Sequence, residues 1–78
     1  MSVTYYVAIP FVRTEDGDLA PGEAVEVQSE GAAKSRAKLM AVNTAGAIAF
    51  ARTGDPSIGE FQPAVILARY GETPDEVE

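Results

Sequence analysis

The stretch NTAGAIAFART, residues 43–53, decides the fold of this 78-residue chain. If it continued the preceding helix, an asparagine, a threonine and a glycine, all poor helix formers, would lie inside that helix. If it is a separate element, the helix ends near Gly46, which would act as a left-handed cap. From Ile48 to Arg52, large side chains alternate with alanines, which is the period of a strand. We therefore expect a strand over residues 47–53, with the continued helix as the alternative.

The segment that precedes this stretch has the features of a helix with one buried side. The Ser29 hydroxyl can cap the first turn, and Glu30 lies near the positive end of the helix dipole. Small apolar residues recur at helical spacing. They are Ala33, Ala37, Met40 and Ala41, with Lys34, Ser35 and Lys38 on the opposite side. We expect Leu39 to widen the buried stripe and Val42 to fall outside it.

Three further segments have the composition of strands. They are VTYYVAIPFVR at residues 3–13, AVEVQ at 24–28 and AVILARY at 64–70. Pro10 lacks an N–H, so it should lie at a bulge or where the first strand has no partner on that side. The predicted fold class is therefore α+β, in the order ββαββ: a mostly antiparallel four-stranded sheet with one helix packed on one face.

The length of the chain is enough for one domain. We expect this single domain to span residues 1–72, followed by an acidic, flexible tail over residues 73–78. One helix cannot cover both faces of a sheet whose outer strands are apolar on both sides. An uncovered apolar face commonly marks an interface.

The composition excludes several classes of enzyme. The chain contains no Cys and no His, so disulfides, thiolate metal sites and the Cys-His and Ser-His-Asp catalytic devices cannot form. The loop Asp16-Gly17-Asp18 lacks the later bidentate glutamate that a calcium loop needs, so we interpret it as a solvated turn. We expect a protein that is not an enzyme and has no catalytic residue, cofactor or metal.

The charge of the chain bears on its partners and location. Twelve acidic and six basic residues give a formal net charge of −6, which disfavours contact with nucleic acid phosphates. No apolar run approaches the ~20 residues of a membrane span, and the opening residues MSVTYYVAIPFV lack the basic region of a signal peptide. A cytoplasmic location without a membrane partner is the expectation.

The stretch ARTGDPSIGEF, residues 51–61, has the glycine spacing of a phosphate-binding loop. Such a loop needs Lys and then Ser or Thr after its second glycine, but Glu60 and Phe61 occupy those positions. We therefore interpret the stretch as the turn of a hairpin. As an alternative function, small-ligand binding or a minor enzymatic role could use Arg52, Asp55 and Glu60 around this loop.

A weaker alternative is nucleic-acid binding. Lys34, Arg36 and Lys38 place three of the six cations within five residues, although Arg36 projects to a different side from the two lysines. The overall negative charge favours a solvated helix face instead.

Residues 46–75, GAIAFARTGDPSIGEFQPAVILARYGETPD, contain the stretches GAIAF, RTGDP, GEF and VILARYGE in that order. In these stretches the chain resembles a group of short uncharacterised proteins from alphaproteobacteria. The resemblance implies a bacterial protein that stands alone as a unit. It implies no activity, so it transfers no functional residue.

The leading hypothesis is a small non-enzymatic protein that works through protein–protein contact at its uncovered sheet face. Self-association into a homodimer is one form of this hypothesis. The sequence leaves the partner open.

Overall fold

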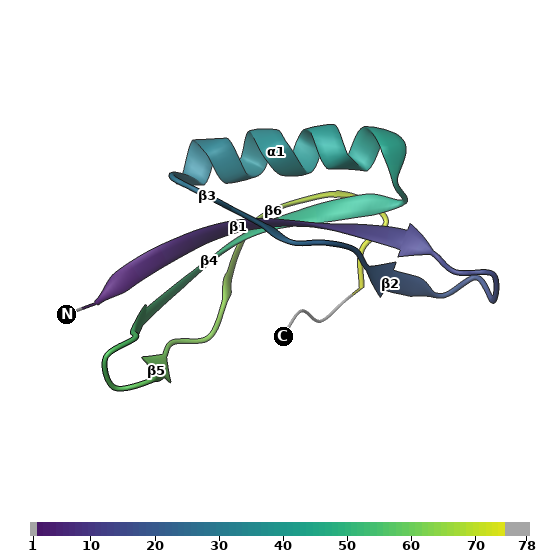
Figure 1. The fold of residues 1–78 in the computed structure, drawn as a ribbon. Coiled ribbons are helices and arrows are strands. Elements are labelled where there is room, and N and C mark those ends of the chain that lie inside the picture. The colour runs from purple at the N-terminus through teal and green to yellow at the C-terminus, as the bar shows by residue number, and fades with distance from the viewer. Residues whose placement is uncertain (1, 75–78) are drawn as a thin grey trace.

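The structure, a computed structural model, describes residues 2–74 and is α+β, as the sequence predicts. One helix and a curled antiparallel sheet make up this described part of the chain (Figure 1). The elements are β1 (Val3–Arg13), β2 (Leu19–Pro21), β3 (Val25–Val27), α1 (Glu30–Asn43), β4 (Gly46–Asp55), β5 (Glu60–Phe61) and β6 (Val65–Gly71). The predicted order ββαββ differs from the observed one, because the short strands β2 and β5 were not expected.

The centre of the sheet is the antiparallel pair of β1 and β4, which runs from Val3 opposite Gly54 to Phe11 opposite Gly46. The strands β2 and β3 pair with the outer edge of β1, while β5 and β6 pair with the outer edge of β4. This register sorts the side chains, because alternate residues of a strand point to opposite sides of the sheet.

Pro10 lies where β1 needs no donor on its outer edge. The N–H of Gly22 donates to the Pro10 carbonyl at 2.8 Å. The N and the carbonyl of one strand residue point to the same edge, so the Pro10 nitrogen also faces this edge. It falls between the residues of β1 that pair with β3 and those that pair with β2. The proline therefore costs the sheet no hydrogen bond.

The helix stops before the strand, which confirms the first expectation. Asn43 ends α1 and Thr44 is extended, with its hydroxyl 2.7 Å from the carbonyl oxygen of Met40. At the other end, the Ser29 hydroxyl accepts a hydrogen bond from the Ala32 N–H at 3.1 Å, as the predicted cap.

The predicted left-handed cap at Gly46 is wrong. Positive φ angles occur in the described chain at Gly17, Gly59 and Gly71, and not at Gly46. Gly46 is instead required by close packing of the backbone. A Cβ atom there would lie 2.1 Å from the carbonyl oxygen of Glu72, which follows β6.

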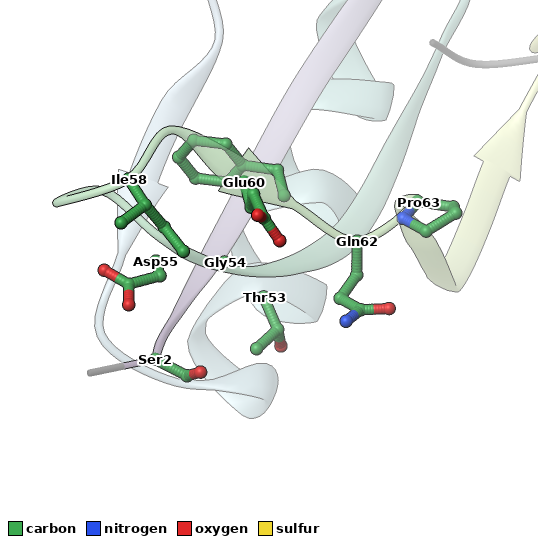
Figure 2. Close-up of a pocket in the computed structure, with 9 residues that line it drawn as sticks. Ser2, Thr53, Gly54, Asp55, Ile58, Glu60, Gln62 and Pro63 are labelled. Carbon is green, nitrogen blue, oxygen red and sulfur yellow. The ribbon is translucent and has the colours of Figure 1, made fainter.

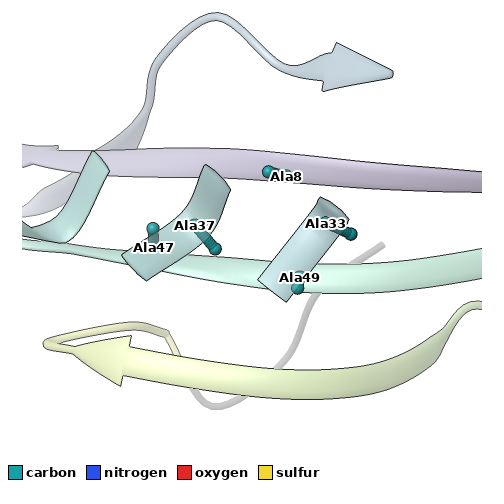
Figure 3. Close-up of a cluster of buried hydrophobic side chains, with 5 residues drawn as sticks. All are labelled: Ala8, Ala33, Ala37, Ala47 and Ala49. Atoms are coloured by element: carbon teal, nitrogen blue, oxygen red, sulfur yellow. The ribbon is translucent and has the colours of Figure 1, made fainter. Parts of the chain in front are cut away.

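A cluster of alanines joins α1 to the sheet. Ala33 and Ala37 of the helix pack against Ala8 of β1 and against Ala47 and Ala49 of β4, and all five are fully buried (Figure 3). Tyr6, Val27, Met40, Ala41, Leu67, Ala68 and Tyr70 surround the cluster as half-buried side chains. Methyl groups alone separate the two layers at this point, so the helix lies close to β1 and β4.

The expectation that Leu39 widens the buried stripe is wrong. Leu39 is 67% exposed, because it follows Ala37 by two residues and so lies about 200° further round the helix. Val42, which was expected outside the stripe, is 75% exposed.

Side chains on the other side of the sheet are also buried in part. Ile48 is fully buried and Phe11 is 4% exposed. The chain after β6 returns toward this side: Glu72 forms an ion pair with Arg13, and Arg69 donates to Thr73 Oγ1 and to the carbonyl of Pro74 at 2.7 Å. By register, Arg13 and Arg69 share the side of Phe11 and Ile48.

Two expectations concern the tail of the chain and a membrane span. Of the predicted flexible tail, Thr73 and Pro74 are described and make the contacts above, whereas residues 75–78 lie outside the described residues. Within residues 2–74, no helix is both long enough and apolar enough to span a membrane.

We predict that Gly46→Ala destabilises the fold strongly. The added methyl group would meet backbone atoms of Tyr70 and Glu72 within 2.6 Å, and these atoms cannot move without breaking the β4–β6 pairing. We expect a loss of roughly 3 kcal/mol or more in the free energy of unfolding, measured by urea denaturation. The control is Gly31→Ala in α1, where no atom lies within 4 Å of the new methyl group. This change should stabilise the fold by up to about 1 kcal/mol. Equal stability of the two variants would contradict the prediction.

We also predict that Ala37→Leu costs about 1–3 kcal/mol of stability, because the alanine cluster has no room for a larger side chain. Thermal and urea denaturation would measure the cost. Ser35→Leu adds the same side chain to the exposed side of the same helix and should change stability by less than about 0.5 kcal/mol. A tolerated leucine at position 37 would show that the helix lies further from the sheet.

Candidate functional site

The hairpin of β4 and β5 carries a hollow at one end of the sheet (Figure 2). Its volume is about 300 Å³. Ser2, Thr53, Gly54, Asp55, Ile58, Glu60, Phe61, Gln62 and Pro63 line it. Most of these residues are exposed, so the hollow is open to solvent.

The turn between the two strands confirms the hairpin interpretation of residues 51–61. The Asp55 carboxylate accepts hydrogen bonds from the N–H of Ser57 at 3.0 Å and from the Ser57 hydroxyl, an arrangement typical of aspartate at turns. Gly59 has a φ of 70°, which allows the chain to turn back into β5. The backbone amides of this loop thus belong to a reverse turn, and up to residue 74 no helix follows that could bind a phosphate.

The hollow is acidic in character. Asp55 and Glu60 are cross-strand partners, so their side chains leave the same side of the hairpin. Hydrogen bonds that its carboxylate accepts, two of them from Ser57, lower the pKa of Asp55 below its ordinary value. Asp55 is therefore ionised at neutral pH and unsuited to act as a general acid. Among residues 2–74, no group of three or more Asp, Glu, His or Cys side chains is placed to hold a metal ion.

The structure does not bring the three predicted loop residues together. Asp55 and Glu60 line the hollow, but Arg52 does not. Arg52 is opposite Tyr5 in the register and shares the side of Ile48 and Phe50. Residues 52 and 55 of one strand differ in parity, so their side chains leave opposite sides of the sheet. This difference in position along the strand is visible in the sequence alone.

The predicted basic patch is spread over the outer surface of α1. Lys34 forms an ion pair with Glu30 at 3.0 Å, one turn earlier. Arg36 and Lys38 are exposed. At about 100° per residue, Arg36 lies nearly half a turn round the helix from both Lys34 and Lys38. The three cations therefore do not form one surface for a phosphate backbone.

A different surface emerges on the side of the sheet that carries Arg52. We call it the open end. It comprises Val3, Tyr5, Val7, Phe50, Arg52, Phe61 and Ile66, which the register places on one side. Tyr5, Val7, Phe50 and Ile66 are half-buried, while Val3 is 39% and Phe61 48% exposed. Ile48 and Phe11, which are buried, lie beyond it on the same side.

Phe61 is held against the sheet by its neighbours. Its ring lies over Gly54, where a Cβ atom would be 2.3 Å from the ring carbon Cδ1. The rings of Tyr5 and Phe61 lie 6.2 Å apart at their centroids, with an interplanar angle of 42°. This tilted contact fixes two half-exposed aromatic rings beside Arg52.

Arg52 is the polar member of the open end. Its Nε atom is buried and has no hydrogen-bond partner. Within residues 2–74 the guanidinium makes no ion pair. A buried donor without a partner costs free energy.

Comparisons with known proteins identify no relative of this chain. No protein-family model, no curated protein and no solved structure matches the chain. The resemblance to short alphaproteobacterial proteins therefore stays a prediction.

Proposed function

We propose that this protein is a small, non-enzymatic protein that acts by binding another protein through the open end. The observation that carries the proposal is a half-exposed set of aromatic and aliphatic side chains around Arg52, whose Nε has no partner. We place this function in the cytoplasm as part of the same proposal.

In this proposal, β1, β3, β4 and β6 form a ββαββ frame with α1 packed on one face. The helix α1 then covers the side of the sheet that carries the alanine cluster, and among residues 2–74 no helix covers the opposite side. Residues Glu72–Pro74 contact Arg13 and Arg69 on that side, toward Ile48 and Phe11. The open end lies toward the β4–β5 hairpin, where Val3 and Phe61 keep much of their surface exposed.

The composition of the open end supports protein binding. Tyr, Phe and Arg are enriched at the centres of protein interfaces, where aromatic anchors supply most of the binding energy. Tyr5, Phe50, Phe61 and Arg52 are residues of these kinds. Rings that are already held in place lose little conformational freedom on binding.

The guanidinium of Arg52 adds a requirement for the partner. A planar guanidinium binds a carboxylate through two parallel hydrogen bonds, and such bonds are strong when water is excluded. Arg52 is half-buried, and a protein that covers the apolar residues and offers a carboxylate to the exposed part of its side chain would pair this charge. The open end therefore favours a partner with an acidic side chain among apolar ones.

The acidic hollow gives weaker support to a ligand-binding or enzymatic role. Glu60 is exposed and Asp55 half-buried, and hydrogen bonds hold Asp55 in the ionised form. Arg52, which could have bound an anionic substrate beside them, lies on the opposite side of the sheet. Association through the open end is the function that this geometry supports best.

We predict that the open end is covered by a protein inside the cells that naturally produce this chain. Because the chain has no cysteine, a single introduced thiol reports on its own surroundings. Val3→Cys places a thiol at the open end, and Val42→Cys places one on the outer side of α1. Alkylation of Cys at position 3 should be slowed several-fold in intact cells compared with dilute purified protein, as measured by mass spectrometry.

The matched Val42→Cys variant corrects for entry of the reagent into the cell. Its labelling should change only as much as the reagent concentration does. If the ratio of the two labelling rates is the same in cells and in dilute solution, the open end is bare in the cell and the proposed function is wrong.

A further inference from the structure

We infer that the partner of the open end is a second copy of this chain, with Arg52 of each copy bound to Glu26 of the other. The inference rests on the proposed function and names the partner that this function requires. It follows from the positions of two opposite charges on one side of the sheet.

Glu26 lies on the same side as the open end. It is opposite Val7 in the pairing of β3 with β1, so its side chain leaves the side of Val7, away from α1. Its neighbours Val25 and Val27 are half-buried, and Val27 packs against the alanine cluster, whereas Glu26 is exposed. Among residues 2–74 it makes no ion pair.

Arg52 and Glu26 flank β1 without meeting. Arg52 is opposite Tyr5 on β4, and Glu26 is opposite Val7 on β3. Neighbouring strands lie about 4.8 Å apart, so the two residues are roughly 10–12 Å apart across the sheet. Among residues 2–74, Arg52 and Glu26 are thus opposite charges without an ion pair on one side of the sheet, with Tyr5 and Val7 between them.

This arrangement is self-complementary under a two-fold rotation. In a symmetric dimer, residue i of one copy contacts residue j of the other, and j contacts i. A two-fold axis that lies in the plane between the two sheets and passes over β1 between Tyr5 and Val7 would bring each Arg52 onto Glu26 of the second copy. Two ion pairs would then flank a centre made of Tyr5, Val7 and Phe50. Two twisted sheets can pack face to face in this way and share one apolar layer.

Other partners satisfy less of the surface. An acidic peptide would pair with Arg52 but would leave Glu26 desolvated and alone, at a cost in free energy. A cationic partner would do the reverse. A nucleic acid or an anionic lipid surface would meet a chain with a net charge of −6. A second copy of the chain pairs both Arg52 and Glu26.

The test is sedimentation equilibrium of the full chain from nanomolar to millimolar concentration, with charge-reversed variants. We expect a wild-type dimer. Arg52→Glu alone and Glu26→Arg alone should each raise the dissociation constant by at least about tenfold, because each places like charges together. The double variant Arg52→Glu with Glu26→Arg restores opposite charges and should return to within about threefold of wild type.

Two variants with the same changes in net charge serve as controls. Lys38→Glu matches Arg52→Glu, and Glu23→Arg matches Glu26→Arg, at exposed positions outside the open end. Both should leave the dissociation constant nearly unchanged. If a reversed variant fails to fold by circular dichroism, Arg52→Gln and Glu26→Gln remove the charges singly with less disturbance and should each weaken the dimer.

Each outcome decides a separate point. A chain that is monomeric at every concentration overturns the second copy as partner, while the labelling of the Val3→Cys variant in cells still decides the proposed function. A dimer that responds to Arg52→Glu and Glu26→Arg no more than to the controls uses another surface. Single variants that weaken the dimer without rescue in the double variant overturn the pairing of Arg52 with Glu26.

Discussion

The contact between methyl groups of α1 and of the two central strands is the constraint on which the rest of the structure depends. Ala33 and Ala37 lie directly against Ala8, Ala47 and Ala49, and none of the five retains exposed surface. Small side chains bury little area each, so this layer gains its stability from closeness rather than from bulk. Larger side chains are therefore displaced to the rim of the helix or to the other side of the sheet. Ile48, the largest fully buried side chain in residues 2–74, lies on that other side.

This division of small and large residues makes the two sides of the sheet differ in how they pack. The alanine side is closed by the helix and has no room for a partner. The other side holds the rings of Tyr5, Phe11, Phe50 and Phe61 together with Arg52, and only a part of it is buried by the chain itself. The half-exposed apolar surface of the open end is thus a consequence of how closely the helix packs.

Much of this arrangement is readable from the sequence. Three predictions depend on neighbouring residues alone, and the structure agrees with each of them. They are the strand after Gly46, the cap at Ser29 and the hairpin around Gly59 in place of a phosphate-binding loop. Interactions between distant residues were harder to predict. The role of Gly46 is set by Glu72, far along the chain, and β2 and β5 are too short to show a period. The separation of Arg52 from Asp55 can be predicted from their positions along one strand. The missing hydrogen-bond partner of Arg52 Nε depends on the packing of several strands and cannot be predicted in this way.

The pairing of β1 with β4 has a consequence for how the molecule is made. Val3 is joined to Gly54 and Phe11 to Gly46, so the middle of the sheet links segments about half the chain apart. On the ribosome, β1 emerges long before β4 exists, and it is apolar on both sides and unpaired along one edge. Folds dominated by such distant contacts form slowly, because the intervening loop must close first. During this interval the nascent chain is at its most prone to aggregation, and the acidic residues between β1 and β2 would keep neighbouring chains apart.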